Sequence, residues 1–273
     1  DDLEDEMITS LGNRTVKEIA ALSQKGKERN QKDVFVAEGI KMFLEAPTER
    51  ICGVYVSQSA ESEVLLQCTE KLRGLSYELV SDEVFAKISD TMTPQGILCL
   101  VRQFHYDLKG ILEDKGNGKI EKQMLLIMLE DIQDPGNLGT IFRTAEAVGA
   151  DGVIMSRRTV DLYNPKTVRS TMGSVYRVPF LYVEDISSII KLLQEKGVCV
   201  YAAHLGGKEY YEEFDYRKST AFLIGNEGKG LRKETAACAD MFVKIPMEGK
   251  VESLNAAVAS SVLLYEAYRQ RRM

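Results

Sequence analysis

The sequence predicts an α/β protein with two domains, the second built on a mostly parallel sheet and the first a smaller α/β/α domain. Short β-type runs alternate with helical stretches along the chain. In the second half these runs are apolar almost throughout, as in strands that are covered on both faces. A stretch rich in Gly and charged residues separates the two halves, and a length of 273 residues suits two domains.

The composition is that of a globular protein, with 44% hydrophobic and 28% charged residues. No run approaches the roughly 18 apolar residues that a membrane span needs. Residues 1–6 are mostly acidic, whereas a signal peptide would be basic and then apolar, so we expect a cytoplasmic protein without membrane contact. The five cysteines are scattered without a CxxC pair, which favours reduced thiols over disulfides or zinc. The net charge of −6 does not favour nucleic acid, so any RNA binding requires a local patch.

The first domain is expected over residues 1–107, followed by a linker over 108–122 with a Gly- and Lys-rich centre at 115–119. Strands are predicted at 34–37, 51–56, 77–80 and 96–101. Helices are predicted near 15–30, 39–46, 60–73 and 82–89. This alternation indicates a small sheet with helices on its faces.

The second domain is expected over residues 123–273. Its predicted strands are 124–129, 152–155, 178–183, 198–203, 221–224 and 242–245, with helical stretches between them. A parallel sheet of about six strands follows from this pattern. Ligands of such sheets bind beyond the carboxyl ends of the strands, so the loops at that edge are the candidate site.

The first such loop runs from Gln133 to Gly139 and continues into a helix. Asp-Pro-Gly is a sequence that favours a turn, and Asn137 stands where a helix N-cap is expected. Arg143 follows six residues later, so its long side chain could reach back over the loop. A capped helix with a surface arginine remains an alternative interpretation.

The second loop follows the strand at 221–224 and contains Gly225, Gly228 and Gly230, which allow a ligand to approach the backbone. It lacks the G-x-x-x-x-G-K-[ST] pattern of a P-loop. Glu227 lies within it, although a phosphate site would avoid an acid. This indicates a ligand with a cationic group or an acid that orients an arginine, with a plain Gly-rich turn as the alternative.

The third loop leads from Ile245 through a Gly-containing segment to Ser253-Leu254-Asn255, which open a long helix. Ser253 is expected as the N-cap and Asn255 as an exposed first-turn residue. The helix has two apolar faces, one with Val258, Val262 and Tyr265, which indicates packing against its own sheet and against a further surface such as a second subunit.

A metal site or a Ser-His-Asp triad is not expected, because the only two histidines, His105 and His204, lie far apart in the sequence. His204 follows a predicted strand and is expected to line the pocket without doing chemistry.

These three loops, in this order, resemble the motifs of the SpoU-type (TrmH-like) RNA ribose 2′-O-methyltransferases of the SPOUT superfamily. The matching stretches are 137–147, 223–231 and 245–259, within a resemblance that covers about 123–273. Residues 10–105 resemble the substrate-binding domain that often precedes this catalytic domain, with a ribosomal-protein-like fold. That second resemblance rests on the order of elements and on residues 35–39.

The resemblance implies a deep trefoil knot, a homodimer, and S-adenosyl-L-methionine as the cofactor. By position it implies cofactor contacts at Gly225, Ile245 and Leu254, with Ala202 and Ala203 as neighbours. It implies a catalytic polar set of Asn137, Arg143, Glu227, Ser253 and Asn255. The family proposal makes Arg143 a base, but a guanidinium is not deprotonated in proteins. We therefore expect Arg143 to stabilise the developing alkoxide, held in place by Glu227 and Asn137.

The expected activity is methyl transfer from S-adenosylmethionine to a ribose 2′-hydroxyl of RNA. Ribosomal RNA is preferred because a first domain of this type usually accompanies that substrate. The alternatives are a tRNA ribose methyltransferase, a SPOUT enzyme that methylates a base, and a catalytically silent RNA-binding or ribosome-assembly protein. A nucleotide-phosphate enzyme is disfavoured by the absent Walker pattern and by Glu227.

Overall fold

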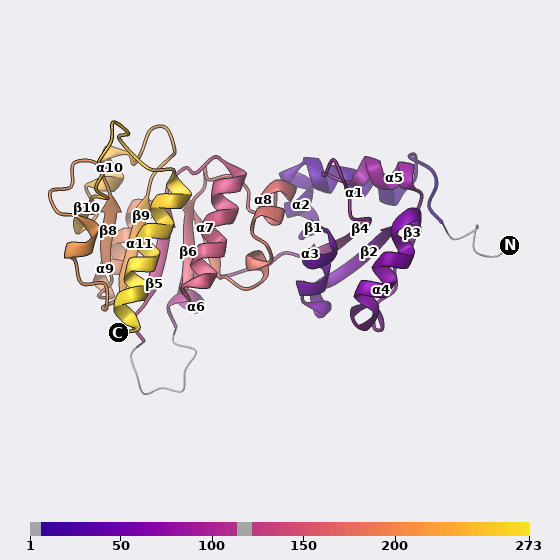
Figure 1. Cartoon of the computed structure of the whole chain (residues 1–273), viewed down its shortest axis with the longest axis horizontal. Coiled ribbons are helices and arrows are strands. Elements are labelled where there is room, and N and C mark those ends of the chain that lie inside the picture. The colour runs from indigo at the N-terminus through magenta and orange to yellow at the C-terminus, as the bar shows by residue number, and fades with distance from the viewer. Residues whose placement is uncertain (1–6, 114–121) are drawn as a thin grey trace. The chain divides into compact units, whose positions relative to one another are not determined.

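The computed structural model describes residues 7–113 and 122–273, which form two compact units (Figure 1). The first unit holds the chain up to Phe104 together with residues 161–176, and the second holds residues 105–160 and 177–273. The acidic start and the Gly- and Lys-rich segment at 115–119 lie outside the described residues.

The first unit is built on a four-stranded sheet in the order β1-β4-β2-β3, in which only β2 and β3 are parallel. Its strands are β1 (Val34–Glu38), β2 (Ile51–Ser57), β3 (Glu78–Val80) and β4 (Ile97–Arg102). Its helices are α1 (Arg14–Gln24), α2 (Gly26–Lys32), α3 (Ile40–Glu45), α4 (Glu61–Leu72), α5 (Asp82–Ile88) and α8 (Pro165–Ser170). The four predicted strands are therefore confirmed. The single helix predicted at 15–30 is wrong, because the backbone of Lys25 is extended and separates α1 from α2.

Residues 161–176, which we expected in the second domain, pack with the first unit. The carboxylate Oδ2 of Asp161 forms an ion pair with Nη2 of the buried Arg29 at 2.6 Å. The ring of Tyr163 stacks on Phe35, with centroids 4.5 Å apart, and the hydroxyl of Tyr176 donates to a backbone carbonyl of α3 at 2.8 Å. These contacts join positions more than 120 residues apart, so local patterns could not reveal them. The limits of the domains stay a prediction.

The second unit is built on a six-stranded sheet in the order β10-β8-β9-β5-β6-β7, and every neighbouring pair is parallel. Its strands are β5 (Leu125–Leu129), β6 (Gly152–Ser156), β7 (Phe180–Val183), β8 (Cys199–Ala203), β9 (Thr220–Ile224) and β10 (Met241–Val243). Its helices are α6 (Leu108–Leu112), α7 (Pro135–Ala147), α9 (Ile186–Glu195), α10 (Lys233–Ala236) and α11 (Ala256–Arg271). The parallel six-stranded sheet is confirmed. Helix α6 occupies the start of the predicted linker, and its Ile111 is buried in the core of this unit.

Helices cover both faces of this sheet. Helices α7 and α11 lie side by side (Figure 1), and the hydroxyls of Thr144 and Ser261 meet between them at 2.9 Å. Helix α9 packs against the face that carries Leu126 and Met128. Since side chains alternate between the faces of a strand, burial on both sides explains the uninterrupted apolar runs. Among the described helices, none combines the length and the apolar character that crossing a membrane requires.

The short 3₁₀ turns are Thr48–Arg50, Gln58–Ala60, Ser174–Tyr176 and Tyr211–Glu213. The last of these lies in the acidic, aromatic stretch after β8. There the fully buried Tyr216 packs against Tyr201 and Phe222, with ring centroids 4.9 and 5.0 Å away. The aromatic residues anchor this loop on the sheet.

Candidate functional site

The loop after β5 enters α7 through an Asp-Pro step. Asp134 is the N-cap, and its Oδ1 accepts a 2.8 Å hydrogen bond from the backbone N–H of Asn137. Pro135 follows as the first helical residue, where its fixed φ and missing N–H suit the helix. The expectation that Asn137 is the cap is therefore wrong. Asn137 stands inside the first turn, so its side chain is available for contacts beyond the helix.

The loop after β9 is closed on itself by Asn226. Its Oδ1 accepts the N–H groups of Gly228 and Lys229 at 3.0 Å each, and its Nδ2 donates to the backbone carbonyl of Asp131, in the loop after β5, at 2.7 Å. The backbone of Gly230 returns so close that a Cβ on Gly225 would lie 2.3 Å from the Gly230 carbonyl carbon. Asn226 was not among the predicted site residues, although an Asn two residues before a Gly signals this turn.

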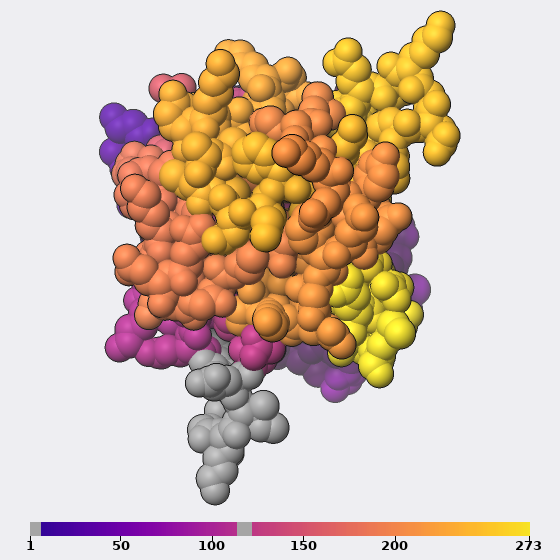
Figure 2. All heavy atoms as spheres, turned by 90° about the vertical axis from the view of Figure 1, so that its left-hand side faces the viewer, coloured from indigo at the N-terminus to yellow at the C-terminus, as the bar shows by residue number. Residues whose placement is uncertain are grey.

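The loop before α11 ends at Asn255, which is the N-cap of that helix. Its Oδ1 accepts the N–H groups of Ala257 at 2.8 Å and Val258 at 3.2 Å. The prediction that Ser253 caps the helix is wrong, because the helix begins at Ala256 and the cap must immediately precede it. Figure 2 shows the chain around residue 250, in gold, projecting from the surface of the second unit.

A chain of hydrogen bonds joins the three loops. The carboxylate of Glu227 accepts the backbone N–H groups of Gln133 at 3.1 Å and Asp134 at 3.0 Å, and the Nδ2 of Asn137 at 3.2 Å. The Oδ1 of Asn137 in turn accepts the Nδ2 of Asn255 at 2.9 Å. The structure thus brings together three of the five residues predicted as a catalytic set.

These contacts decide the charge of Glu227. Partial burial raises the pKa of its carboxyl, but the hydrogen bonds from Asp134, Gln133 and Asn137, together with one from its own backbone, outweigh burial and leave the pKa below its ordinary value. Glu227 is therefore a carboxylate at neutral pH. It acts as the acceptor that fixes the first loop and the second loop to each other.

Gln133 adds a further link, which the sequence analysis did not assign. Its Nε2 donates to the backbone carbonyls of Asp131 at 3.2 Å and Arg158 at 2.6 Å. Arg158 belongs to the loop after β6, so Gln133 connects a fourth strand end to the same group.

Arg143 is exposed and stands apart from this chain of hydrogen bonds. Six residues along an α-helix correspond to a rotation of about 240°, so Arg143 and Asn137 lie about 120° apart around α7. Within the part of the chain that the structure describes, the side chain of Arg143 has no hydrogen bond or ion pair. The expected contacts of Arg143 with Glu227 and Asn137 are absent there, because backbone amides and Asn137 occupy the carboxylate of Glu227.

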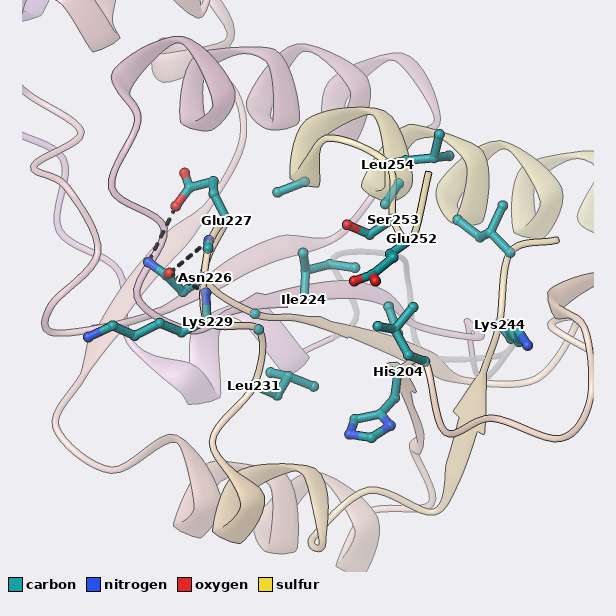
Figure 3. Close-up of a pocket in the computed structure, with 18 of the residues that line it drawn as sticks. His204, Ile224, Asn226, Glu227, Lys229, Leu231, Lys244, Glu252, Ser253 and Leu254 are labelled. Atoms are coloured by element: carbon teal, nitrogen blue, oxygen red, sulfur yellow. Dashed lines mark hydrogen bonds between the residues drawn. The ribbon is translucent and has the colours of Figure 1, made fainter. Parts of the chain in front are cut away.

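The hydrogen-bonded residues Glu227, Asn137 and Asn255 form a polar chain. A cavity of about 370 Å³ opens beside this polar chain, at the carboxyl ends of β8, β9 and β10 (Figure 3). Six of the ten predicted site residues line it: Ala203, Gly225, Glu227, Ile245, Ser253 and Leu254. Four do not, namely Asn137, Arg143, Ala202 and Asn255. Ala202 is fully buried in the core between β8 and α9, so it supports the wall from behind.

The wall of the cavity is largely apolar, from Ile224, Leu231, Val243 and the three predicted residues Ile245, Leu254 and Ala203. His204 lines it as expected, and its ring stacks on Phe242 with centroids 4.4 Å apart while its Nδ1 accepts a backbone N–H. Glu252 also lines it, which the sequence analysis did not predict. In residues 7–113 and 122–273, no group of three His, Cys, Asp or Glu side chains is arranged to hold a metal ion.

Comparison with known proteins gives matches over most of the chain. Residues 124–265 match the SpoU rRNA Methylase family, and residues 13–99 match the MRM3-like substrate binding domain. The chain is 30% identical over 263 residues to the 23S rRNA (guanosine(2553)-2′-O)-methyltransferase RlmP of Bacillus subtilis, covering 94% of this chain and 97% of that protein. It is 32% identical over 251 residues to the 23S rRNA (guanosine-2′-O-)-methyltransferase RlmB of Shewanella oneidensis, covering 89% and 99%.

Two solved structures with bound AdoMet are also similar. The rRNA methyltransferase from Sinorhizobium meliloti superposes with a TM-score of 0.79 at 34% identity, covering 96% of this chain and 97% of that one. The SpoU methyltransferase AviRb from Streptomyces viridochromogenes superposes with a TM-score of 0.83 at 26% identity, covering 95% and 98%. Each likeness extends over both units.

Proposed function

We infer that this chain, which belongs to the SpoU rRNA methylase family, transfers a methyl group from S-adenosylmethionine to a ribose 2′-hydroxyl of ribosomal RNA. The observation that carries this inference is the hydrogen-bonded chain Glu227–Asn137–Asn255, which joins three loops beside a cavity. The relatives named as 23S rRNA 2′-O-methyltransferases match it over nearly their whole length, and two similar structures hold AdoMet.

The cavity fits the cofactor. Its volume of about 370 Å³ lies within the range of about 300–1,000 Å³ typical of small-molecule pockets. The apolar side chains of Ile224, Ile245 and Leu254 suit a purine ring, and the closely packed backbone at Gly225 forms part of the wall. When bound, S-adenosylmethionine supplies an activated methyl group on a positively charged sulfur.

The exposed guanidinium of Arg143 suits the RNA side of the reaction. An arginine cannot accept the proton of the ribose hydroxyl, but it can donate hydrogen bonds to the developing alkoxide and to the neighbouring phosphate. In our proposal Asn137 and Glu227 fix the loop before Arg143 rather than Arg143 itself. Ser253, exposed at the cavity, orients the ribose or the cofactor.

Ribosomal RNA is the proposed substrate, and tRNA is the alternative. The first unit matches a substrate-binding domain, and the relatives RlmP and RlmB described above act, by name, on 23S rRNA. The intact set of Asn137, Glu227 and Asn255 contacts argues against a catalytically silent protein on the same fold.

We also propose a cytoplasmic homodimer with the trefoil knot of the superfamily. Helix α11 buries Ala256, Leu263 and Ala267, whereas Val258 and Tyr265 are 48% and 50% exposed. The sequence predicted this second apolar face, and a second copy of the chain would cover it. Sedimentation equilibrium of the wild type and of Tyr265→Glu tests this, since only the wild type is expected to have twice the mass of the chain.

The activity is tested by incubating the protein with methyl-labelled S-adenosylmethionine and RNA. We expect label in 23S rRNA, in a linkage that resists alkaline hydrolysis because the 2′-oxygen is blocked. Label confined to tRNA would favour the alternative substrate. Cofactor binding without label in any RNA would favour the silent protein.

A further inference from the structure

Glu252 places a negative charge at the wall of the cavity, which also contains the apolar residues Ile245 and Leu254. It belongs to the segment between β10 and α11, and it is exposed. Figure 3 nevertheless shows its carboxylate directed into the cavity, beneath Ser253. Within residues 7–113 and 122–273, no hydrogen bond or ion pair engages this carboxylate, so none of the side chains described there pairs with its charge.

The other charged residues described at the cavity form no ion pair with Glu252. Glu227 is held by the amides of the first loop and turns away from the cavity centre. Figure 3 shows the side chain of Lys229 extending away from the cavity and Lys244 on the opposite side from Glu227. The cavity therefore presents one unpartnered carboxylate to whatever it binds.

The position of Glu252 relates this charge to the reacting end of the ligand. Glu252 stands three residues before Asn255, which is bonded to Asn137 in the polar chain. In the proposed function Ser253, which lines the cavity two residues before Asn255, orients the ribose or the cofactor, so the methyl group and the charged sulfur that carries it face Ser253. The sulfur therefore belongs on the side of the cavity that Ser253 and Glu252 form.

We propose that Glu252 is a specificity-determining residue that distinguishes S-adenosylmethionine from its product S-adenosylhomocysteine by the charge on sulfur. Both ligands carry the same ammonium and carboxylate groups, but only the substrate has a sulfonium. A carboxylate near the sulfur attracts the substrate and not the neutral thioether, which favours release of the product after each turnover. This inference rests on the proposed function.

The test compares ligand affinities of Glu252→Gln by isothermal titration calorimetry. The ligands are S-adenosylmethionine, S-adenosylhomocysteine and sinefungin, in which a C–NH₃⁺ group replaces the sulfonium. The carboxylate of Glu252 would lie a few ångströms from the positive charge at the sulfur position, and water partly screens this attraction. We therefore expect the Kd of S-adenosylmethionine and of sinefungin to rise roughly tenfold. The Kd of S-adenosylhomocysteine should change by less than about twofold, because it lacks the charge that the carboxylate attracts.

Glu248→Gln is the matched control. Glu248 is exposed on the same segment but does not line the cavity, so its substitution should leave all three Kd values unchanged. Thermal unfolding of each variant verifies the fold. An equal loss for all three ligands would place Glu252 at the shared ammonium group and overturn the inference, as would unchanged affinities in Glu252→Gln. If the wild type bound neither S-adenosylmethionine nor S-adenosylhomocysteine, the proposed function itself would fail.

Discussion

Replacing Gly225 with alanine tests whether the loop after β9 shapes the cofactor site. The added Cβ would lie 2.3 Å from the carbonyl carbon of Gly230 and 2.3 Å from the nitrogen of Leu231. Ordinary contacts of a Cβ are 3.4–4 Å, so the returning backbone must move by about 1 Å. Both neighbours are main-chain atoms, so no side-chain rotation can relieve the clash.

Overpacking of this kind costs about 1–3 kcal/mol, which lowers the Tm of the second unit by roughly 3–10 °C. The displaced backbone also lines the cavity, so we expect the Kd for S-adenosylmethionine to rise at least about tenfold, equivalent to about 1.4 kcal/mol. Differential scanning fluorimetry and calorimetric titration measure the two effects.

Gly228→Ala is the control in the same loop. The nearest atom to its Cβ would be the Oδ1 of Asn226 at 3.7 Å, and its φ is not in the left-handed region. We expect this variant to keep the Tm of the wild type, because its added Cβ meets no atom closer than an ordinary contact. If Gly225→Ala kept both the Tm and the Kd of the wild type, the backbone of this loop would not define the cofactor site, and the reasoning would be refuted.

Three further predictions concern the polar residues. Asn255→Ala should lose about 1 kcal/mol of stability with its cap, whereas Asn255→Ser should recover the stability in urea denaturation but not methyl transfer, because serine cannot reach Asn137; recovery of both would show that only the cap matters. Because the pKa of Glu227 is lowered in the folded protein, its contribution to stability is present above its ordinary pKa of 4.5 and is lost as the pH falls through the folded pKa. Glu227→Gln should therefore destabilise at pH 7 and converge with the wild type in acid, and a pH-independent difference in denaturation midpoint would contradict this. Arg143→Ala should keep the fold and cofactor affinity but lose methyl transfer, with Arg143→Lys restoring only part of it; near-normal transfer by Arg143→Ala would remove the assigned role.

The strands of both sheets could be predicted from the sequence, because a buried strand is a short run of mostly apolar residues. Strands β5 and β9 are covered on both faces, so their residues, apart from Thr220 at the start of β9, are apolar and stand out from the flanking loops. The predicted N-caps of α7 and α11, Asn137 and Ser253, were wrong. Asp134 is the cap of α7, because Pro135 is the first helical residue. Asn255 is the cap of α11, because that helix begins at Ala256.

The contacts within the site could not be predicted, because they join residues far apart in the sequence. Nothing near Glu227 indicates that amides 93 and 94 residues away will occupy its carboxylate, or that Asn137 will reach Asn255 across 118 residues. For the same reason the sequence could not show that the partners of Glu227 in this structure are Asn137 and two backbone amides, where a link to Arg143 was expected. The residue types identified the site, while the pairing within it depends on the packing of three loops.

The most direct test of the central claim is methylation of ribosomal RNA from a strain that lacks this protein. The RNA is incubated with purified protein and S-adenosylmethionine, and ribose 2′-O-methyl groups are mapped by their resistance to alkaline cleavage. We predict one new protected position in 23S rRNA with the wild type and none with Arg143→Ala. A methyl group on a base, or no new methyl group in rRNA, would contradict the account.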